Sequence, residues 1–206
     1  MTDRGPAPSA RSIAAKKQRV RRDVAARIRA APPDRRREWD LAIQRRILAH
    51  PVFVSARRIH CYLALPVEAA TEPVVRAALA QGKEVAVPVV EAEPSCLRFA
   101  AITDYDRDLA PGYRGILEPR FERRRFIGAD QIDLFLIPGV AFDAGGYRLG
   151  RGLGYYDRCL AGLAPRQMVC ALAYELQVLD RLPVEAHDVQ VDLIMTEKRI
   201  ISCPRK

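Results

Sequence analysis

The sequence predicts a single α/β domain with three layers, helix, sheet and helix, a mostly parallel central sheet and an N-terminal helical pair. Two observations support this prediction. Helical periodicity fills residues 12–50, and apolar runs of strand length alternate with helix-length segments after Pro51. Strands that alternate with helices favour a parallel sheet with right-handed crossovers. We expect residues 1–10 to be a disordered tail and residues 11–206 to form the domain.

Two amphipathic helices are expected at the start of the domain. The first, at residues 12–30, has an apolar stripe of residues spaced four apart: Val20, Val24 and Ile28. Pro32 and Pro33 end this helix, and Asp34 is expected to cap a second helix that runs to about residue 50. The apolar residues of the second helix are Trp39, Leu41, Ile43, Ile47 and Leu48.

The remaining elements follow in order after Pro51. Strands are expected at residues 58–65, 84–90, 97–102, 132–137, 167–174 and 191–196, with residues 198–202 at the other edge of the sheet. Helices are expected at residues 71–81 and 155–163, the first capped by Thr71 and ended by Gly82, and a short helix or turn is expected at residues 175–182. Residues 104–126 lack clear periodicity and contain two prolines and two glycines, so we expect a long, largely irregular connection.

Residues 138–158 are the most distinctive stretch of the chain. Five glycines between residues 145 and 154 let backbone N–H groups come close to a bound group. Arg148 and Arg151 lie among them, and a guanidinium can fork onto phosphate or carboxylate oxygens. The helix expected to follow would point its free N–H groups at the same space. The pattern therefore favours an anion site, with a flexible surface loop and solvated arginines as the alternative.

The spacing of these glycines matches neither common nucleotide fingerprint. Gly150, Gly152 and Gly154 alternate, unlike the glycines of a P-loop or of a dinucleotide-binding turn. Ligands of open α/β sheets lie beyond the carboxyl ends of the strands, where the glycine loop, Glu68 and Tyr174 are all expected. We therefore expect these segments to meet in one cleft.

The formal net charge of +9 is concentrated near the N-terminus. Residues 1–60 hold 16 Lys and Arg against 5 Asp and Glu, a net charge of +11, and the remainder carries −2. This block could bind nucleic acid or a polyanionic small ligand, or it could be a solvated helix face. Trp39 and Phe53 are its only aromatic residues, which leaves few platforms for base stacking, so we do not expect a nucleic-acid partner.

Composition restricts the compartment and the cofactors. No stretch approaches 18 consecutive apolar residues, and the start of the chain lacks the apolar core of a signal peptide. We expect a cytoplasmic monomer without a membrane partner. The five cysteines are scattered and odd in number, which favours reduced thiols over disulfides or zinc.

The sequence resembles one protein family. Within residues 138–157, Pro-Gly-x-x-Phe-Asp followed by Gly-x-Arg-Leu-Gly-Arg-Gly-x-Gly-Tyr-Tyr-Asp is similar to the signature of 5-formyltetrahydrofolate cyclo-ligase, also called 5,10-methenyltetrahydrofolate synthetase. Further matches are Lys17 with Arg21, residues 65–71, the element Gly115-Ile-Leu-Glu118-Pro119 and residues 182–192. The resemblance spans roughly residues 12–197.

The resemblance implies a reaction and a set of site residues. ATP cleavage, with Mg²⁺, would drive cyclisation of 5-formyltetrahydrofolate to 5,10-methenyltetrahydrofolate, releasing ADP and phosphate through a phosphorylated formyl (iminium phosphate) intermediate. It implies ATP contacts from Lys17, Arg21, Arg148, Gly150, Arg151, Gly152, Gly154, Tyr155 and Tyr156. It implies catalytic roles for Arg148, Arg151 and Tyr155, substrate contacts from Glu68, Arg151 and Tyr155, and Mg²⁺ ligands in Asp157 and Asp192.

Several points stay open at this stage. Leu153 stands where some family members carry lysine, which removes one cation from the loop, and Lys16 competes with Lys17 for the inward position. Asp157 could instead favour a helix start, the tyrosines could be core aromatics, and Asp192 could be a turn residue. Two other functions are considered: a family-like ATP-dependent protein with a different formylated or carboxylated substrate, and a basic nucleic-acid-binding module.

Overall fold

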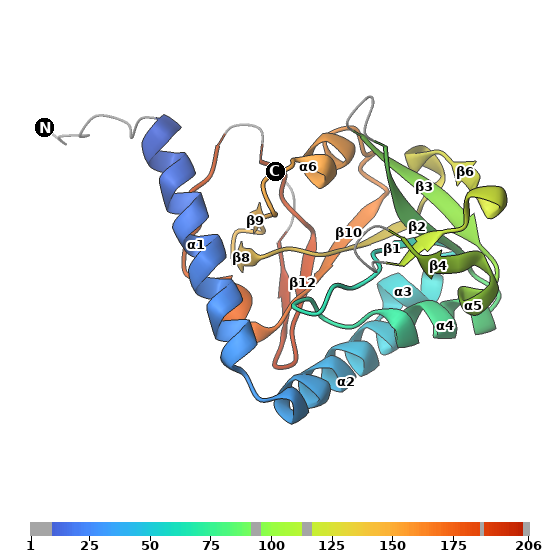
Figure 1. The fold of residues 1–206 in the computed structure, drawn as a ribbon, viewed down its shortest axis with the longest axis horizontal. Helices are drawn as coiled ribbons and strands as arrows, with labels where there is room; N and C mark the ends of the chain where they lie inside the picture. The colour runs from blue at the N-terminus through green and yellow to red at the C-terminus, as the bar shows by residue number, and fades with distance from the viewer. Residues whose placement is uncertain (1–9, 92–95, 113–116, 186–187, 204–206) are drawn as a thin grey trace, which may run out of the picture.

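The computed structural model describes residues 10–91, 96–112, 117–185 and 188–203. Its central feature is an eight-stranded sheet in the order β13-β12-β10-β7-β1-β2-β3-β6 (Figure 1). The five inner strands from β12 to β2 are parallel, whereas β13, β3 and β6 are antiparallel to their neighbours. The predicted mostly parallel α/β sheet is therefore confirmed. The predicted tail, residues 1–10, lies almost wholly outside the described residues.

The elements have the following bounds. The helices are α1 Ala10–Ala30, α2 Pro33–Ala49, α3 Pro51–Ser55, α4 Glu72–Ala80, α5 Tyr105–Asp108 and α6 Tyr155–Leu160. The strands are β1 Arg58–Cys61, β2 Glu84–Glu91, β3 Cys96–Ile102, β4 Leu109–Pro111, β5 Leu117–Pro119, β6 Arg125–Ile127, β7 Leu134–Ile137, β8 Ala141–Asp143, β9 Arg148–Leu149, β10 Met168–Leu172, β11 Val178–Leu179, β12 Leu193–Met195 and β13 Ile200–Ser202. Short 3-10 helices are η2 Phe121–Arg123, η3 Ala129–Gln131 and η4 Glu175–Gln177.

Alternating residues of the inner strands pack into two cores, one on each face of the sheet. Ile59 and Leu134 belong to the core that also contains buried residues of α1, α2, α3 and α4. Phe135 and Val169 belong to the second core, which contains Leu160 of α6. Successive side chains of a strand point to opposite faces, so strands covered on both sides must be apolar throughout. This arrangement gives the three expected layers, and Figure 1 shows α2, α3 and α4 on the side of the sheet away from α6.

The N-terminal helical pair is confirmed, with one correction. α1 packs through the buried side chains of Val24 and Ile28 and contacts η4 and β8. α2 begins at Pro33, directly after Pro32, and no side chain caps it. Asp34 was expected to be that cap, but it lies in the first turn and pairs with the guanidinium of Arg37. Proline needs no hydrogen bond for its nitrogen at this position, which explains the earlier start.

The segment 104–126 is more regular than predicted. It contains α5 and parts of two small pairings: β4 with β5, and β6 with β3. The prediction of a largely irregular connection was wrong, because these short elements lack the continuous apolar run that marks the inner strands. The glycine stretch likewise contains an antiparallel hairpin of β8 and β9 that was not predicted. Gly115 of the resembling element lies outside the described residues.

The ends of β1 and α4 can also be compared with the prediction. β1 ends at Cys61 instead of residue 65, so Leu63 and Leu65 leave the sheet. Thr71 precedes α4 as predicted, but its hydroxyl donates to the Tyr62 carbonyl (2.7 Å) instead of capping the helix. Gly82 follows α4 at a φ of 73°, in agreement with its predicted role as the helix end. Among the helices of the described residues, none combines the length and apolarity that a membrane span requires.

Candidate active site

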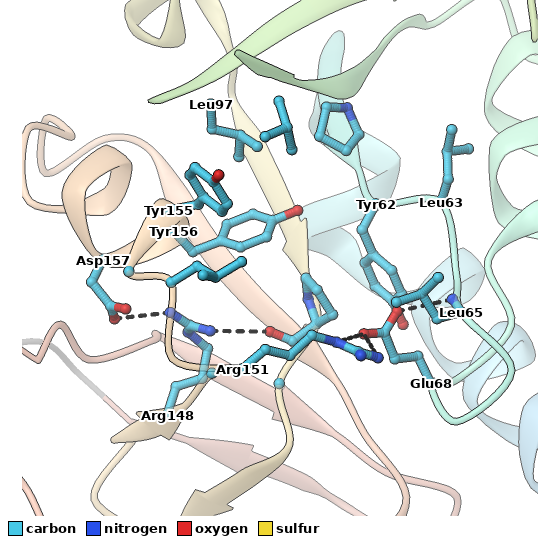
Figure 2. Close-up of a pocket in the computed structure, with 17 residues that line it drawn as sticks. Tyr62, Leu63, Leu65, Glu68, Leu97, Arg148, Arg151, Tyr155, Tyr156 and Asp157 are labelled. Carbon is cyan, nitrogen blue, oxygen red and sulfur yellow. Dashed lines mark hydrogen bonds and ion pairs between the residues drawn. The ribbon is translucent and has the colours of Figure 1, made fainter. Parts of the chain in front are cut away.

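A cavity of about 300 Å³ lies at the carboxyl ends of β1 and β7 (Figure 2). Its walls come from four parts of the chain: the segment after β1, the β2 and β3 strands, the segment after β7, and the glycine loop with the start of α6. The lining residues are Tyr62, Leu63, Leu65, Glu68, Pro88, Val90, Leu97, Pro138, Gly139, Arg148, Gly150, Arg151, Leu153, Gly154, Tyr155, Tyr156 and Asp157. The predicted meeting of Glu68 with the glycine loop is confirmed.

Tyr174 lies next to this cavity, not in its wall. It lines a neighbouring hollow that also includes Leu65 and Glu68. Its hydroxyl donates to the carboxylate of Asp40 (2.9 Å) and lies 3.2 Å from the backbone oxygen of Glu68. Burial is the main cause that raises the pKa of both Asp40 and Tyr174. Tyr174 therefore supports the backbone that carries Glu68.

Arg148 provides a buried positive charge at the back of the cavity. It lies on β9, its side chain is 3% exposed, and its Nη2 donates to Asp157 Oδ1 at 2.8 Å. Nη1 lies 3.5 Å from the Pro138 carbonyl, and the guanidinium carbon lies 5.6 Å from the centre of the Tyr156 ring. Its Nε is buried without a hydrogen-bond partner among the described residues. A buried donor of this kind costs roughly 1–3 kcal/mol, and one acceptor from a ligand would relieve that cost.

Arg151 and Glu68 form an ion pair at the mouth of the cavity (Figure 2). Arg151 Nη2 and Nε lie 3.0 and 3.2 Å from Glu68 Oε1, across 83 positions of sequence. Glu68 Oε2 accepts from the backbone N–H of Leu65 at 2.9 Å, which orients the carboxylate. The Arg151 side chain is 49% exposed and that of Glu68 is 10% exposed. The structure therefore pairs two residues that the sequence resemblance assigned to substrate contacts, although they lie far apart in the sequence.

Two glycines determine the path of the loop into α6. Gly152 and Gly154 have φ angles of 102° and 67°, values that residues with a Cβ adopt only with strain. Gly154 directly precedes Tyr155, the first residue of α6. Because α6 has only six residues, its contribution to the positive potential is smaller than a long helix would make. The backbone N–H groups and arginines carry more of the predicted anion site than the helix does.

The hydroxyl of Tyr156 is fixed by His60, a residue that the sequence did not place in the site. His60 is fully buried on β1, and its Nδ1 lies 3.1 Å from the Ala86 carbonyl. A carbonyl only accepts, so Nδ1 carries the proton and Nε2 accepts from the Tyr156 hydroxyl at 3.1 Å. Burial lowers the pKa of His60 to about 3, so the ring is neutral near pH 7. A histidine inside an apolar strand gave no sequence signal for this contact.

Lys17 and Arg21 on α1 contact other parts of the domain but do not line the cavity. Arg21 Nε donates to the backbone oxygen of Gly150 at 2.8 Å, which ties α1 to the glycine loop. Lys17 is 8% exposed, and its Nζ lies 2.8 Å from Glu185 and 2.7 Å from Asp188. Desolvation lowers the pKa of Lys17, but the hydrogen bonds to Asp188 and Glu185 outweigh it and raise that pKa. Lys16 is exposed, so Lys17 is the lysine that faces inward.

The two predicted metal ligands are not in the same place. Asp157 lines the cavity with a side chain that is 18% exposed. Asp192 precedes β12 and is absent from the cavity wall, and its carboxylate accepts from the backbone N–H of Val169 (2.7 Å) on β10. Asp192 therefore joins the starts of two neighbouring strands, and its role as a Mg²⁺ ligand stays a prediction that the cavity wall does not support. Across the described ranges, no cluster of three or more His, Cys, Asp or Glu side chains could hold a metal ion.

Asp143 is a further residue that the sequence analysis did not single out. It is buried at the end of β8, and its Oδ1 accepts from the backbone N–H groups of Gly145 and Tyr147. Its Oδ2 accepts from the N–H of Leu182. Aspartate before two glycines is a turn signal, so the pattern Asp-Ala-Gly-Gly could have revealed the β8–β9 hairpin that presents Arg148.

Comparison with known proteins gives consistent results. The model of the 5-formyltetrahydrofolate cyclo-ligase family matches residues 13–197. The chain is 28% identical to the mouse 5-formyltetrahydrofolate cyclo-ligase over 88% of this chain and 93% of that protein. It is 33% identical to the mitochondrial enzyme of that name from Arabidopsis thaliana, over 92% and 77% of the two chains. The solved structure of Aquifex aeolicus 5,10-methenyltetrahydrofolate synthetase has a TM-score of 0.80 at 29% identity, covering 92% of this chain and 94% of that one.

Proposed function

The chain belongs to the 5-formyltetrahydrofolate cyclo-ligase family, and on that premise we propose that it cyclises 5-formyltetrahydrofolate to 5,10-methenyltetrahydrofolate with ATP and Mg²⁺. ADP and phosphate would be the other products. The observation that carries the proposal is the cavity itself. It combines a carboxylate at its mouth, a buried guanidinium at its back and apolar walls between them. A flat, polar-edged substrate beside a phosphate fits this combination.

The reaction needs an activated oxygen. The formyl oxygen is a poor leaving group until it takes the γ-phosphoryl group of ATP, which forms an iminium phosphate and releases ADP. The N-10 nitrogen then attacks the formyl carbon and loses its proton to solvent, and the carbon–oxygen bond breaks as phosphate leaves with the bonding electron pair. In such a transfer the protein mainly positions the reactants and stabilises charge on the phosphoryl oxygens.

Arg148 would stabilise that charge. Because its guanidinium is buried and held by Asp157, it is already oriented before a ligand arrives. Its unpartnered Nε adds a donor that a phosphoryl oxygen could satisfy. The N–H groups of Gly150, Gly152 and Gly154 would supplement it, with Arg21 holding the loop through Gly150. Tyr155 and Tyr156 would form the wall beside the reacting groups.

Glu68 and Arg151 would divide the two reactants between them. The Glu68 carboxylate can accept two parallel hydrogen bonds from the amino and ring N–H groups of a pterin. Arg151 would then move from Glu68 to the phosphate side, a change that its 49% exposure permits. Lys17 would contribute to the ATP site from α1, although Glu185 and Asp188 already offset its charge.

Asp157 fits a Mg²⁺ ion better than Asp192 does. Magnesium commonly takes one or two carboxylates together with substrate phosphate oxygens and waters, so a single carboxylate in the wall is a sufficient protein ligand. Asp157 Oδ1 contacts Arg148, so the same carboxylate would order both the arginine and the ion. The ion would reduce the negative charge of the triphosphate. Monomeric state and a cytoplasmic location stay predictions.

The test is direct turnover. Purified protein is mixed with 5-formyltetrahydrofolate, ATP and Mg²⁺, and the ultraviolet absorbance of the methenyl product is followed. We expect turnover that requires both ATP and Mg²⁺ and that falls by about 1000-fold in Arg148→Ala. The exposed substitution Arg22→Ala on α1 serves as a control and should leave the rate unchanged. Absence of product from the unchanged protein under these conditions would overturn the proposal.

A further inference from the structure

Two large apolar side chains on the cavity rim are exposed. Leu153 is 65% exposed and Val90 is 57% exposed, yet both line the cavity. They come from separate elements, the glycine loop and the end of β2. Exposed apolar side chains that converge on a cavity indicate a surface that an apolar part of a ligand covers.

The cavity has a charged end and an apolar end. Figure 2 shows Glu68 and Arg151 together at one end, with Leu97 and Tyr155 at the opposite end. Val90 pairs in register with Leu97 across the β2–β3 pairing, which places it at the apolar end. Leu153 lies two residues from both Arg151 and Tyr155, between the glycines with left-handed φ angles. The backbone conformation of these two glycines sets the path of the loop, and the loop carries the Leu153 side chain into the cavity wall.

We propose that Leu153 and Val90 form an apolar clamp for the para-aminobenzoyl ring of the folate. This inference rests on the proposed function, which places the pterin at Glu68. A folate that is held there extends its second, less polar ring away from the charged end. The nitrogen N-10 is bonded directly to that ring. Clamping the ring therefore also positions the nucleophile of the cyclisation beside the formyl carbon.

The clamp makes a prediction that a purely structural role does not. Leu153→Ser and Val90→Ser should each raise the KM for 5-formyltetrahydrofolate, by about tenfold and about threefold, because less apolar surface is buried on binding. The KM for ATP should stay within about twofold. The inhibition constant of a 5-formyltetrahydropterin fragment that lacks the benzoyl ring should not change, since its contacts lie at the charged end.

Matched controls exclude a general effect of exposed serines. Leu41 and Val54 are 52% and 61% exposed and do not line the cavity, so Leu41→Ser and Val54→Ser should leave every constant unchanged. Leu153→Met should restore the KM for the folate to near that of the unchanged protein. Equal melting temperatures for the variants would show that they are folded.

The outcomes separate the clamp from the reaction. Turnover with an unchanged folate KM in Leu153→Ser and Val90→Ser would overturn the clamp and leave the proposed function intact. A parallel loss of affinity for the fragment would also overturn it, because the side chains would then act on the pterin. No turnover by the unchanged protein would overturn the proposed function, and the clamp with it.

Discussion

The back and the mouth of the cavity hold the same kind of ion pair in different surroundings. At the back, Arg148 and Asp157 have side chains that are 3% and 18% exposed. At the mouth, Arg151 and Glu68 are 49% and 10% exposed. Charge pairs away from water are held strongly and lose much when one partner is removed, whereas exposed pairs contribute little to stability. On the proposed function, we therefore expect Arg148 to be a fixed cation beside the transferred group and Arg151 to be a movable cation at the entrance.

The sharpest way to break this comparison is to remove the buried cation. Arg148→Ala should lower kcat by about 1000-fold, because a preoriented charge on the phosphoryl group is lost. It should also lower the free energy of unfolding by roughly 3 kcal/mol, since Asp157 is left without its partner. Steady-state kinetics and urea unfolding measure the two effects. A kcat within tenfold of that of the unchanged protein would show that Arg148 is not the fixed cation.

The next prediction concerns the neutral histidine behind the same wall. The folded pKa of His60 is about 3 against an ordinary value of 6.5, so unfolded chains bind a proton that the folded state does not. Stability due to this group is therefore full above pH 6.5 and falls by up to about 1.4 kcal/mol per pH unit as the pH drops toward 3.

The measurement compares His60→Leu with the unchanged protein. Urea unfolding at pH 7 and at pH 5 gives the difference in unfolding free energy at each pH. The unfolding free energy of the unchanged protein minus that of His60→Leu should be about 2 kcal/mol smaller at pH 5 than at pH 7. Contributions from carboxylates cancel in this difference. If this difference in unfolding free energy were the same at both values of pH, the inferred neutral, buried ring of His60 would be contradicted.

At the mouth we expect activity to fall while stability stays nearly unchanged. Arg151→Ala should reduce kcat/KM by about 10- to 100-fold, through lost contact with the phosphate side. Its effect on unfolding should be below about 0.5 kcal/mol, because the arginine is half exposed. Thermal unfolding and kinetics on one preparation test both statements. If Arg151→Ala lost as much stability as Arg148→Ala, the contrast between mouth and back would fail.

The smallest expected effect comes from the hydroxyl of Tyr156. Tyr156→Phe keeps the ring in the wall but leaves His60 Nε2 without its donor, which should cost about 1 kcal/mol of stability. We expect kcat/KM to change by only a few-fold, since the hydroxyl is turned toward β1. In Tyr156→Phe combined with His60→Leu, the loss should be smaller than the sum of the two single losses. Full additivity would show that the two side chains do not act through this bond.

Much of the fold could be predicted from local pattern. The spacing of Val20, Val24 and Ile28 predicted α1, and the apolar runs around Ile59 and Leu134 predicted inner strands. The short strands β4 and β8, which lie outside the main sheet, escaped because they are stabilised by pairing partners that local sequence does not specify. The same reason explains the error over residues 104–126.

In the site, too, features that depend on neighbouring residues were predictable, and contacts between distant residues were not. Arg148, Arg151 and the glycines are close in sequence, so their shared loop was predictable, and Glu68 was placed by its position after a strand. The role of Asp157 as partner of Arg148, the pairing of Arg151 with Glu68 and the support of Tyr156 by His60 were not predictable. The contact of Asp192 with the Val169 N–H was not predictable either, because a carboxylate near a strand start has no local signal that separates an N–H partner from a metal.

By itself, the sequence determined the glycine loop, its two arginines and the alternation that makes the sheet. These depend on backbone dihedral freedom and on periodicity, which are properties of neighbouring residues. Only the tertiary structure decided which arginine is buried and which carboxylate each one meets. Strand order and register bring residues 83 positions apart within hydrogen-bonding distance, and burial then sets how strongly each charge is held.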